Sequence, residues 1–329
     1  MPRAEYWTNC WLPDAKLDIP PDLRYAGLPA TSEGGRLDQA AVSFFLATWA
    51  MPSFFKQNPT LPGFGLTFGV SALFVTLVIL TPLAGLMVYT SQMSVEQYWR
   101  AISDPRVVAS YKVTLLGATY ATLAALALGM LISWIIVRYK FPGRGLLDAL
   151  VDLPFALPTA VAGLTLSVLL APGGWVGQWF EPFGIKISYA FPGLVIAMTF
   201  TSLPFVVRSI QPVLEEVGPE YEEAARTLGA NAWQTTWRVI LPALVPAIFT
   251  GASQSFIRSL GEFGAVVMIA GNIPFRTEIT SLMIFTRTSE YDYPSAAAIA
   301  TVVLGASLLL LFLLQVLQGR LLPWQRPGV

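Results

Sequence analysis

The chain has 329 residues, a mean hydropathy of +0.59, only 12% charged residues and a formal net charge of zero. This composition is too apolar for a soluble domain and too often interrupted for a single span, so it predicts an all-α polytopic membrane protein. The sequence has no histidine and one cysteine, Cys10, which excludes an internal disulfide and removes the commonest metal ligand and general base. We therefore expect no metal site, no cofactor and no enzyme activity.

Nucleotide energy, if the protein uses any, has to come from a partner. No Gly-Lys dipeptide occurs in the sequence, so a Walker A phosphate loop is absent. The balanced charge gives no indication of a nucleic-acid partner.

Residues 1–60 differ from the rest and are predicted to form an N-terminal extension. They contain an uncharged run, Gln39–Phe55, that is broken by Pro52 and is short for a membrane span. A seventh span, an interfacial helix and a poorly ordered extension are all compatible with this run, and we favour the last two. Met51 is an alternative start, because MPSFFKQNPTLPGFGLTFG reads as a short polar lead into the first apolar run.

Residues 61–329 are predicted to form one transmembrane domain with six helices, from windows of about 20 apolar residues. The predicted spans are Leu66–Tyr89, Val113–Val137, Leu153–Leu170, Ile187–Val207, Val239–Ile257 and Pro294–Gln318. The third span contains Pro154 and Pro158 near its start, where neighbouring helices can satisfy the freed backbone groups. The fifth span could continue towards Ala270.

A charged, helix-forming stretch, Glu222–Pro242, follows the fourth span and runs into the start of the fifth. Together with the residues from Pro219 we call it the elbow segment (residues 219–242). Pro219 suits a first helical position, and the acidic residues that follow it suit the positive end of a helix dipole. Gly229 is placed as the left-handed residue that ends a helix. Asn231 and Gln234 have capping-box spacing at the start of a second helix. The pattern predicts a helix, a glycine elbow and a second helix that dock into a groove of another protein.

Two other interpretations compete for the elbow segment. A DNA-binding helix-turn-helix motif has a similar Ala-Ala-x-x-Leu-Gly pattern, but it requires a soluble domain with a basic face, whereas acids outnumber bases here. A plain connection between two helices remains the structural alternative.

The elbow segment resembles the EAA loop of the permeases of ABC importers. The residues that carry the resemblance are Glu223, Ala224, Ala225, Gly229, Leu241 and Pro242. In that family the loop is a cytoplasmic coupling helix seated in a cleft of the ATPase subunit, so the resemblance implies that these residues couple the chain to an ATPase. It also implies a multi-pass protein of the bacterial inner (cytoplasmic) membrane with both termini in the cytoplasm. The distribution of lysine and arginine between the loops leans only slightly towards the same orientation.

From about residue 61 to the C-terminus, the chain is similar to the T-type permeases of sulfate/thiosulfate importers. The segments VRYKFPGRGLLDALVDLPFALPTAVAGL from Val137 and SLGEFGAVVMIAGNIPFRTEITSLMIF from Ser259 contribute most. The resemblance implies a heterodimer with a W-type permease, two copies of a cytoplasmic ATPase and a periplasmic sulfate-binding protein. Molybdate permeases share Gly-Glu-Phe-Gly, so a molybdate/tungstate permease is the alternative. An ion-coupled secondary anion transporter is less favoured, because we find no inverted repeat and it leaves the elbow segment without a purpose.

Charged residues in the predicted spans are candidates for the translocation path. Arg258 and Glu262 are four residues apart on one predicted helix face, and burying such a charge in a bilayer costs about 2.5–3.5 kcal/mol on insertion scales. They either line an anion path, with Ser259 as a further donor, or form an ion pair that staples two helices. Arg208 is interpreted as an interfacial anchor. The predicted non-cytoplasmic loops hold Arg100, Arg106, Lys112, Lys186, Arg258, Arg276 and Arg287, which is compatible with an anionic cargo.

Overall fold

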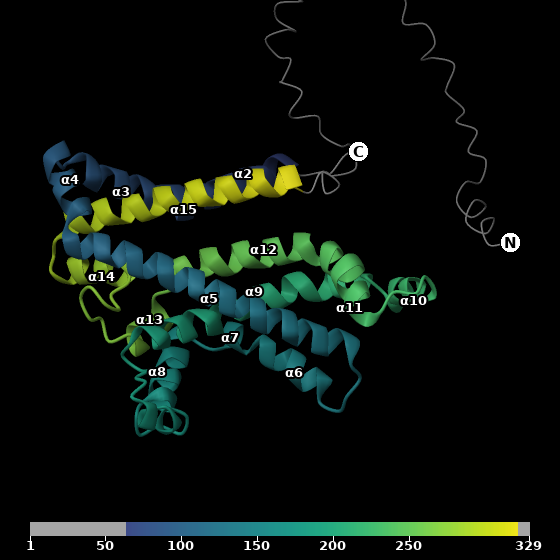
Figure 1. The fold of residues 1–329 in the computed structure, drawn as a ribbon. Helices are drawn as coiled ribbons and strands as arrows, with labels where there is room; N and C mark the ends of the chain where they lie inside the picture. The colour runs from purple at the N-terminus through teal and green to yellow at the C-terminus, as the bar shows by residue number, and fades with distance from the viewer. Residues whose placement is uncertain (1–63, 322–329) are drawn as a thin grey trace, which may run out of the picture. The chain divides into compact units, whose positions relative to one another are not determined.

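The computed structural model describes residues 64–321, which form helices and turns without a β-strand in that range (Figure 1). Contacts divide the chain into two units, residues 1–71 and 72–329, and the second unit holds the features discussed below. The predictions for residues 1–60, including Met51 and the run Gln39–Phe55, lie outside the described residues. Nothing in the structure therefore tests them.

Five helical runs in the described range are long and apolar enough to cross a membrane. They are Gly65–Ser91, Pro105–Arg138, Phe191–Glu216, Ala232–Leu260 and Tyr293–Leu314. The first run joins α2 (Phe64–Val75), the π-helical turn η3 (Thr76–Leu80) and α3 (Thr81–Ser91), and the next two are α5 (Pro105–Arg138) and α9 (Phe191–Glu216). The fifth belongs to α15 (Tyr293–Leu321). The all-α polytopic prediction is confirmed, although the count of six continuous spans is not.

The third predicted span, Leu153–Leu170, is wrong as a continuous helix. The structure has α6 (Arg144–Val151), α7 (Leu153–Ala156) and α8 (Thr159–Leu170), with Leu157 and Pro158 extended between the last two. A proline disfavours the helical conformation of the residue before it, which explains the break at Leu157. At 12 residues, α8 is too short to span a bilayer, which takes about 20 residues.

Helices α5 and α9 nevertheless run in the same direction, so the broken segment must return the chain between them. A Cβ on Gly117 of α5 would lie 2.5 Å from Leu194 of α9, and a Cβ on Gly129 would lie 2.6 Å from Val206. Both pairs keep the same offset along the two helices, which only parallel helices allow. The chain therefore returns between α5 and α9 through three short helices, α6, α7 and α8, instead of one continuous span.

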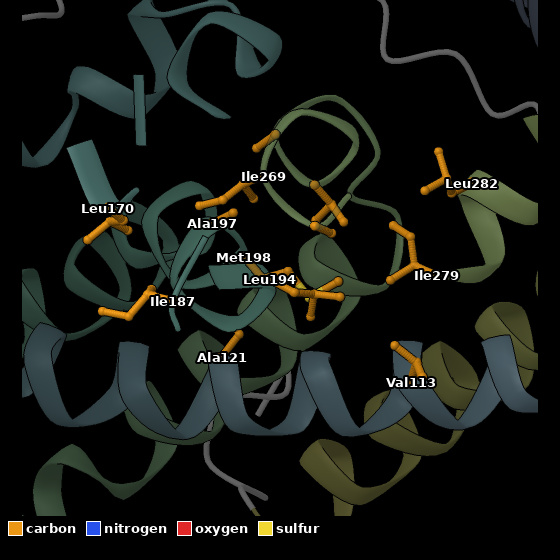
Figure 2. Close-up of a cluster of buried hydrophobic side chains, with 13 residues drawn as sticks. Val113, Ala121, Leu170, Ile187, Leu194, Ala197, Met198, Ile269, Ile279 and Leu282 are labelled. Atoms are coloured by element: carbon orange, nitrogen blue, oxygen red, sulfur yellow. The ribbon is translucent and has the colours of Figure 1, made fainter. Parts of the chain in front are cut away.

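Small residues bring α5 and α9 close together. Gly117, Ala121, Ala125 and Gly129 recur every fourth residue on the buried face of α5, and they let the side chains of α9 pack against its backbone. This small-residue stripe is the usual way for helices to associate in a bilayer, where water does not drive them together. Figure 2 shows Ala121 beside Leu194 and Met198 in the largest buried cluster.

The fifth span is a single rod that begins inside the elbow segment. Helix α11 (Ala232–Thr235), the π-helical turn η6 (Thr236–Ile240) and α12 (Leu241–Leu260) are continuous. The π-helical turn falls just before Pro242, which has no N–H to donate to the carbonyl of Arg238. The rod ends at Leu260, and α13 (Gly264–Ile269) is a separate helix, so the suggested continuation of the span to Ala270 is wrong.

The remaining helices flank this arrangement. Helix α4 (Val95–Ser103) precedes α5, and α14 (Thr280–Ser289) precedes α15. Helix α15 contacts α3, α4, α12 and α14, and α13 packs against α8 (Figure 1). Helices α10 (Pro219–Thr227) and α11 lie beyond the ends of α9 and α12, at the opposite end from α14 (Figure 1).

Candidate functional sites: the elbow segment and paired arginines

The elbow segment folds as its local sequence predicts. Helix α10 begins at Pro219, and Gly229 has φ +84°, the left-handed conformation expected of it. The N–H of Ala230 bonds the carbonyl of Ala225 at 3.0 Å, and the N–H of Gly229 bonds that of Arg226 at 2.9 Å. These two bonds are a Schellman motif, which satisfies carbonyls at a helix end.

The second helix of the elbow segment starts with the predicted capping box. The Asn231 side chain accepts the N–H of Gln234 at 2.8 Å, and the Gln234 side chain accepts the N–H of Asn231 at 3.0 Å. Two backbone donors at the start of a helix are satisfied reciprocally in this way. The two motifs set the angle between α10 and the rod that continues into α12.

The outer surface of the elbow segment is unusually apolar. Tyr221 is 58% exposed, Leu228 88%, Trp233 69% and Trp237 51%, and the two tryptophan rings lie 5.1 Å apart. Of the six residues in the EAA pattern, Glu223, Ala224, Gly229 and Pro242 are exposed, Leu241 is half-buried and Ala225 is buried. Aromatic side chains left exposed on a charged segment suit an interface with another protein.

Arg138 connects the elbow segment to α5, a contact that sequence analysis missed. Its Nη2 donates to the carbonyl of Val217 at 2.8 Å and lies 3.1 Å from Oε1 of Glu222 in α10. Both side chains are largely buried. Glu222 also lies 3.7 Å from the more exposed Arg226. In the sequence, Arg138 marks only the boundary of a predicted span, and no local pattern points to its partner.

Arg258 and Glu262 form an ion pair, but not as predicted. Helix α12 ends at Leu260, so Glu262 lies beyond the helix rather than on its face. The Glu262 carboxylate is 1% exposed and accepts the N–H of Ala265 at 3.0 Å, in the first turn of α13. The carboxylate therefore caps α13 as well as pairing with Arg258. Ser259 is fully buried, and its hydroxyl has no hydrogen-bond partner within the described residues.

Two further arginines are held in ion-pair networks. Arg208 bonds both carboxylate oxygens of Asp152, at 3.0 and 2.6 Å, and one oxygen of Asp148 at 2.8 Å. Arg208 therefore ties α9 to α6, a contact that the sequence did not predict, and its interpretation as an interfacial anchor remains a prediction. Arg106 makes a bidentate pair with the buried Glu278, with both bonds at 2.8 Å. Both networks join residues far apart in the sequence.

Across residues 64–321, no group of three or more histidine, cysteine or acidic side chains is placed to hold a metal ion. The sites described so far therefore offer helix ends, arginine–carboxylate pairs and exposed aromatic side chains. The exposed aromatic side chains suit an interface with another protein.

The long apolar helices, together with the elbow segment beyond their ends, define a multi-pass membrane protein with a candidate docking surface. Residues 113–327 match the family described as binding-protein-dependent transport system inner membrane component. The chain belongs to this family, and the prediction of a transport subunit of the inner membrane rather than an enzyme is confirmed.

Curated relatives agree with the resemblance found in the sequence. The chain is 60% identical over 265 residues to the sulfate transport system permease protein CysT of Escherichia coli, covering 80% of this chain and 96% of that protein. It is 46% identical over 249 residues to the protein of the same name from Synechocystis, covering 76% and 87% of the two chains.

A solved structure confirms the fold. A bacterial ABC transporter involved in the import of the acidic polysaccharide alginate matches with a TM-score of 0.67 at 16% identity, over 87% of this chain and 99% of that chain. At this identity the match establishes the architecture alone.

Proposed function

We propose that the protein is a permease subunit of an ATP-driven importer of sulfate and thiosulfate, and that a separate ATPase drives it through the elbow segment. The observation that carries the proposal is the elbow at Gly229: a Schellman motif and a capping box hold an exposed aromatic surface at the end of a rod that continues through α12. Force applied to α11 would pass into the membrane along one continuous helical run, Ala232–Leu260, and the Schellman motif fixes α10 at the start of that run.

The cargo follows from the relatives. Relatives that are 44–60% identical to this chain are named as sulfate transport permeases, some of them as probable ones. The alignment with the Escherichia coli protein covers 96% of that protein. This favours sulfate over molybdate or tungstate. The proposed partners are a W-type permease, two copies of the ATPase and a periplasmic sulfate-binding protein, with the elbow segment and both termini on the cytoplasmic side.

For the translocation path we propose Arg258, Glu262 and Ser259. A guanidinium paired with a buried carboxylate suits a path for dianions, because the carboxylate can neutralise the guanidinium between cargoes. Arg258 is partly exposed while Glu262 is buried, so the arginine is the member of the pair that a passing anion can reach.

Uptake of radiolabelled sulfate in a host that lacks its own sulfate permease tests the proposal. The chain should restore uptake when it is expressed with its W-type partner, ATPase and binding protein, and not when the ATPase is left out. An excess of unlabelled thiosulfate should compete, whereas molybdate at the same concentration should not. Uptake that persists without the ATPase would contradict the proposal.

A further inference from the structure

A cavity of about 880 Å³ lies beside the first half of α5 and the beginning of α9. Its wall combines one face of α5, including Leu116 and Tyr120, with two loops, residues 171–190 and 270–279. Two cationic side chains line it, Lys186 from the first loop and Arg276 from the second, and no aspartate or glutamate does. Both cations are exposed.

The two loops are held in contact with each other, and this contact brings the two cations to one cavity. The N–H of Tyr189 donates at 2.8 Å to the carbonyl of Ile269, the last residue before the second loop. The Ser188 hydroxyl lies 3.1 Å from that of Ser167 in α8, which holds the first loop to the helix that precedes it. Gly271 has φ +72°, and a Cβ there would come within 2.8 Å of the Tyr189 ring. The close approach of the loops thus requires a glycine.

The loop that bears Arg276 is tightly built. The carbonyl of Ile273 accepts the N–H groups of Arg276, Thr277 and Glu278 at 3.0–3.2 Å, and the Thr277 hydroxyl donates to Ala270 at 2.6 Å. Among the described non-glycine residues, four have positive φ, and three of them, Tyr189, Asn272 and Phe275, belong to these two loops. Strained backbone of this kind persists where the surrounding structure enforces it, and it clusters at functional sites.

The two cations have no counterion within the described chain. Neither Lys186 nor Arg276 makes an ion pair there, unlike the arginines of α4, α12 and α14 and the one at the start of α5. The nearest acid along the chain to Arg276 is Glu278, and Arg106 already engages both of its oxygens. Glu181, in the same loop as Lys186, does not line the cavity. The cavity therefore keeps two uncompensated positive charges.

The N-terminus of α9 adds to this positive potential. Ala190, the residue before α9, and Phe191, its first residue, line the cavity, and no side chain caps this end of the 26-residue helix. Pro192 has no N–H and the N–H of Gly193 bonds the carbonyl of Ala190, so the helix end contributes mainly through its dipole, which favours an anion.

We propose that the Lys186–Arg276 cavity is a low-affinity binding site for a doubly charged tetrahedral oxyanion. A water molecule occupies about 30 Å³ in the liquid, so the cavity holds a hydrated oxyanion with room to spare. It would therefore concentrate and orient the anion with low affinity, through the long-range field of the two cations. The identification of the anion as sulfate rests on the proposed function, whereas the anion preference of the cavity does not.

The charge of the cavity can be measured without transport. The background is the assembled transporter in which Cys10→Ser has removed the one native thiol of this chain. In this background, either Leu116→Cys or Ile273→Cys places a single thiol in the cavity wall. Its reaction with a sulfonate-bearing methanethiosulfonate is compared with that of the trimethylammonium analogue, and labelling is quantified on this chain alone. We expect the anionic-to-cationic rate ratio to fall at least fivefold when Lys186→Gln and Arg276→Gln are added. Lys112→Gln, an exposed cation outside the cavity wall, should leave the ratio unchanged.

Sodium sulfate should also slow the anionic reagent more than sodium chloride at equal ionic strength does. A ratio that does not change in the double variant, or an equal effect of the two salts, overturns the proposal. Failure of both thiols to react would do the same, because the cavity would then be closed to hydrated anions.

Measurements of sulfate uptake distinguish the proposed anion-binding cavity from the proposed importer function on which it rests. At sulfate concentrations below half-saturation, Lys186→Gln with Arg276→Gln should lower the initial uptake rate about tenfold, whereas Lys186→Arg with Arg276→Lys should retain most of it. If the parent transports sulfate and the double glutamine variant transports it equally fast, the proposed anion-binding role of the cavity is wrong, and the proposed importer function is unaffected. If the parent carries no sulfate, the importer is wrong, and the labelling ratio still decides the nature of the cavity.

Discussion

Arg138, in the last turn of α5, lies 3.1 Å from Glu222 in α10 and donates to the carbonyl of Val217, where α9 ends. One guanidinium therefore joins a long parallel helix pair to the elbow segment. Because both side chains are largely buried, water screens their attraction less than it does that of a surface pair. The contact provides a second route, besides the α11–α12 rod, from the elbow segment into the membrane domain.

Arg138→Gln is expected to weaken coupling. The change leaves the Glu222 carboxylate buried without its main partner, which costs about 1–3 kcal/mol. We expect sulfate uptake to drop roughly tenfold per 1.4 kcal/mol lost from the coupled state, while ATP hydrolysis by the purified complex persists. Arg226→Gln is the matched control, because Arg226 is 64% exposed and 3.7 Å from the same carboxylate. Equal losses in the two variants would show that Arg138 has no special role.

Gly229→Asp is expected to abolish transport while leaving the protein in the membrane. A Cβ added at Gly229 would meet no atom within 4 Å, so the penalty comes from φ +84° and from the added charge, not from a clash. The left-handed conformation costs an ordinary residue about 1–2 kcal/mol.

A substitution series separates these two causes. Gly229→Asn should retain more uptake than Gly229→Ala, because asparagine tolerates the left-handed conformation better. Gly145→Asp is the control, since that glycine has open space around it and no positive φ. Normal uptake and normal co-purification of the ATPase with Gly229→Asp would refute the coupling role of the elbow segment.

Trp233→Ala with Trp237→Ala is expected to release the ATPase. These paired rings are two of the exposed aromatic side chains of the elbow segment, and truncating an interface tryptophan that is a hot spot costs about 2 kcal/mol or more, roughly a 30-fold loss of affinity. Co-purification of the ATPase with the tagged chain measures the effect. Trp175→Ala removes a tryptophan that is 84% exposed in the loop after α8, and it should leave co-purification intact.

Arg258→Gln is expected to impair sulfate uptake without loss of subunit assembly. Glu262→Gln keeps an oxygen that can accept the N–H of Ala265, so it preserves the cap of α13 and removes only the charge. The double variant, Arg258→Gln with Glu262→Gln, should therefore assemble normally yet still fail to transport. Sulfate uptake at the parental rate in the double variant would mean that the pair is structural and that other residues line the path.

The sequence by itself determined the elbow segment, because its structure depends on neighbours a few residues apart. The helix ends at Gly229 through bonds from the N–H groups of Gly229 and Ala230 to the carbonyls of Arg226 and Ala225, and the Asn231–Gln234 capping box closes within one turn. The apolar runs likewise identified the long helices, since a membrane span requires only length and hydropathy. The break at Leu157–Pro158 also had a local signal, but averaging hydropathy over a window concealed it.

Tertiary structure alone decided which charges meet. Arg106 and Glu278 are 172 residues apart, and Arg138 and Glu222 come together only because α5 and α9 run parallel and end side by side. Lys186 and Arg276 face one cavity because the close contact of Gly271 with Tyr189 joins two loops that the sequence separates. Hydropathy and helix-end patterns describe each helix alone, whereas the partner of a buried charge depends on which helices pack and in which register.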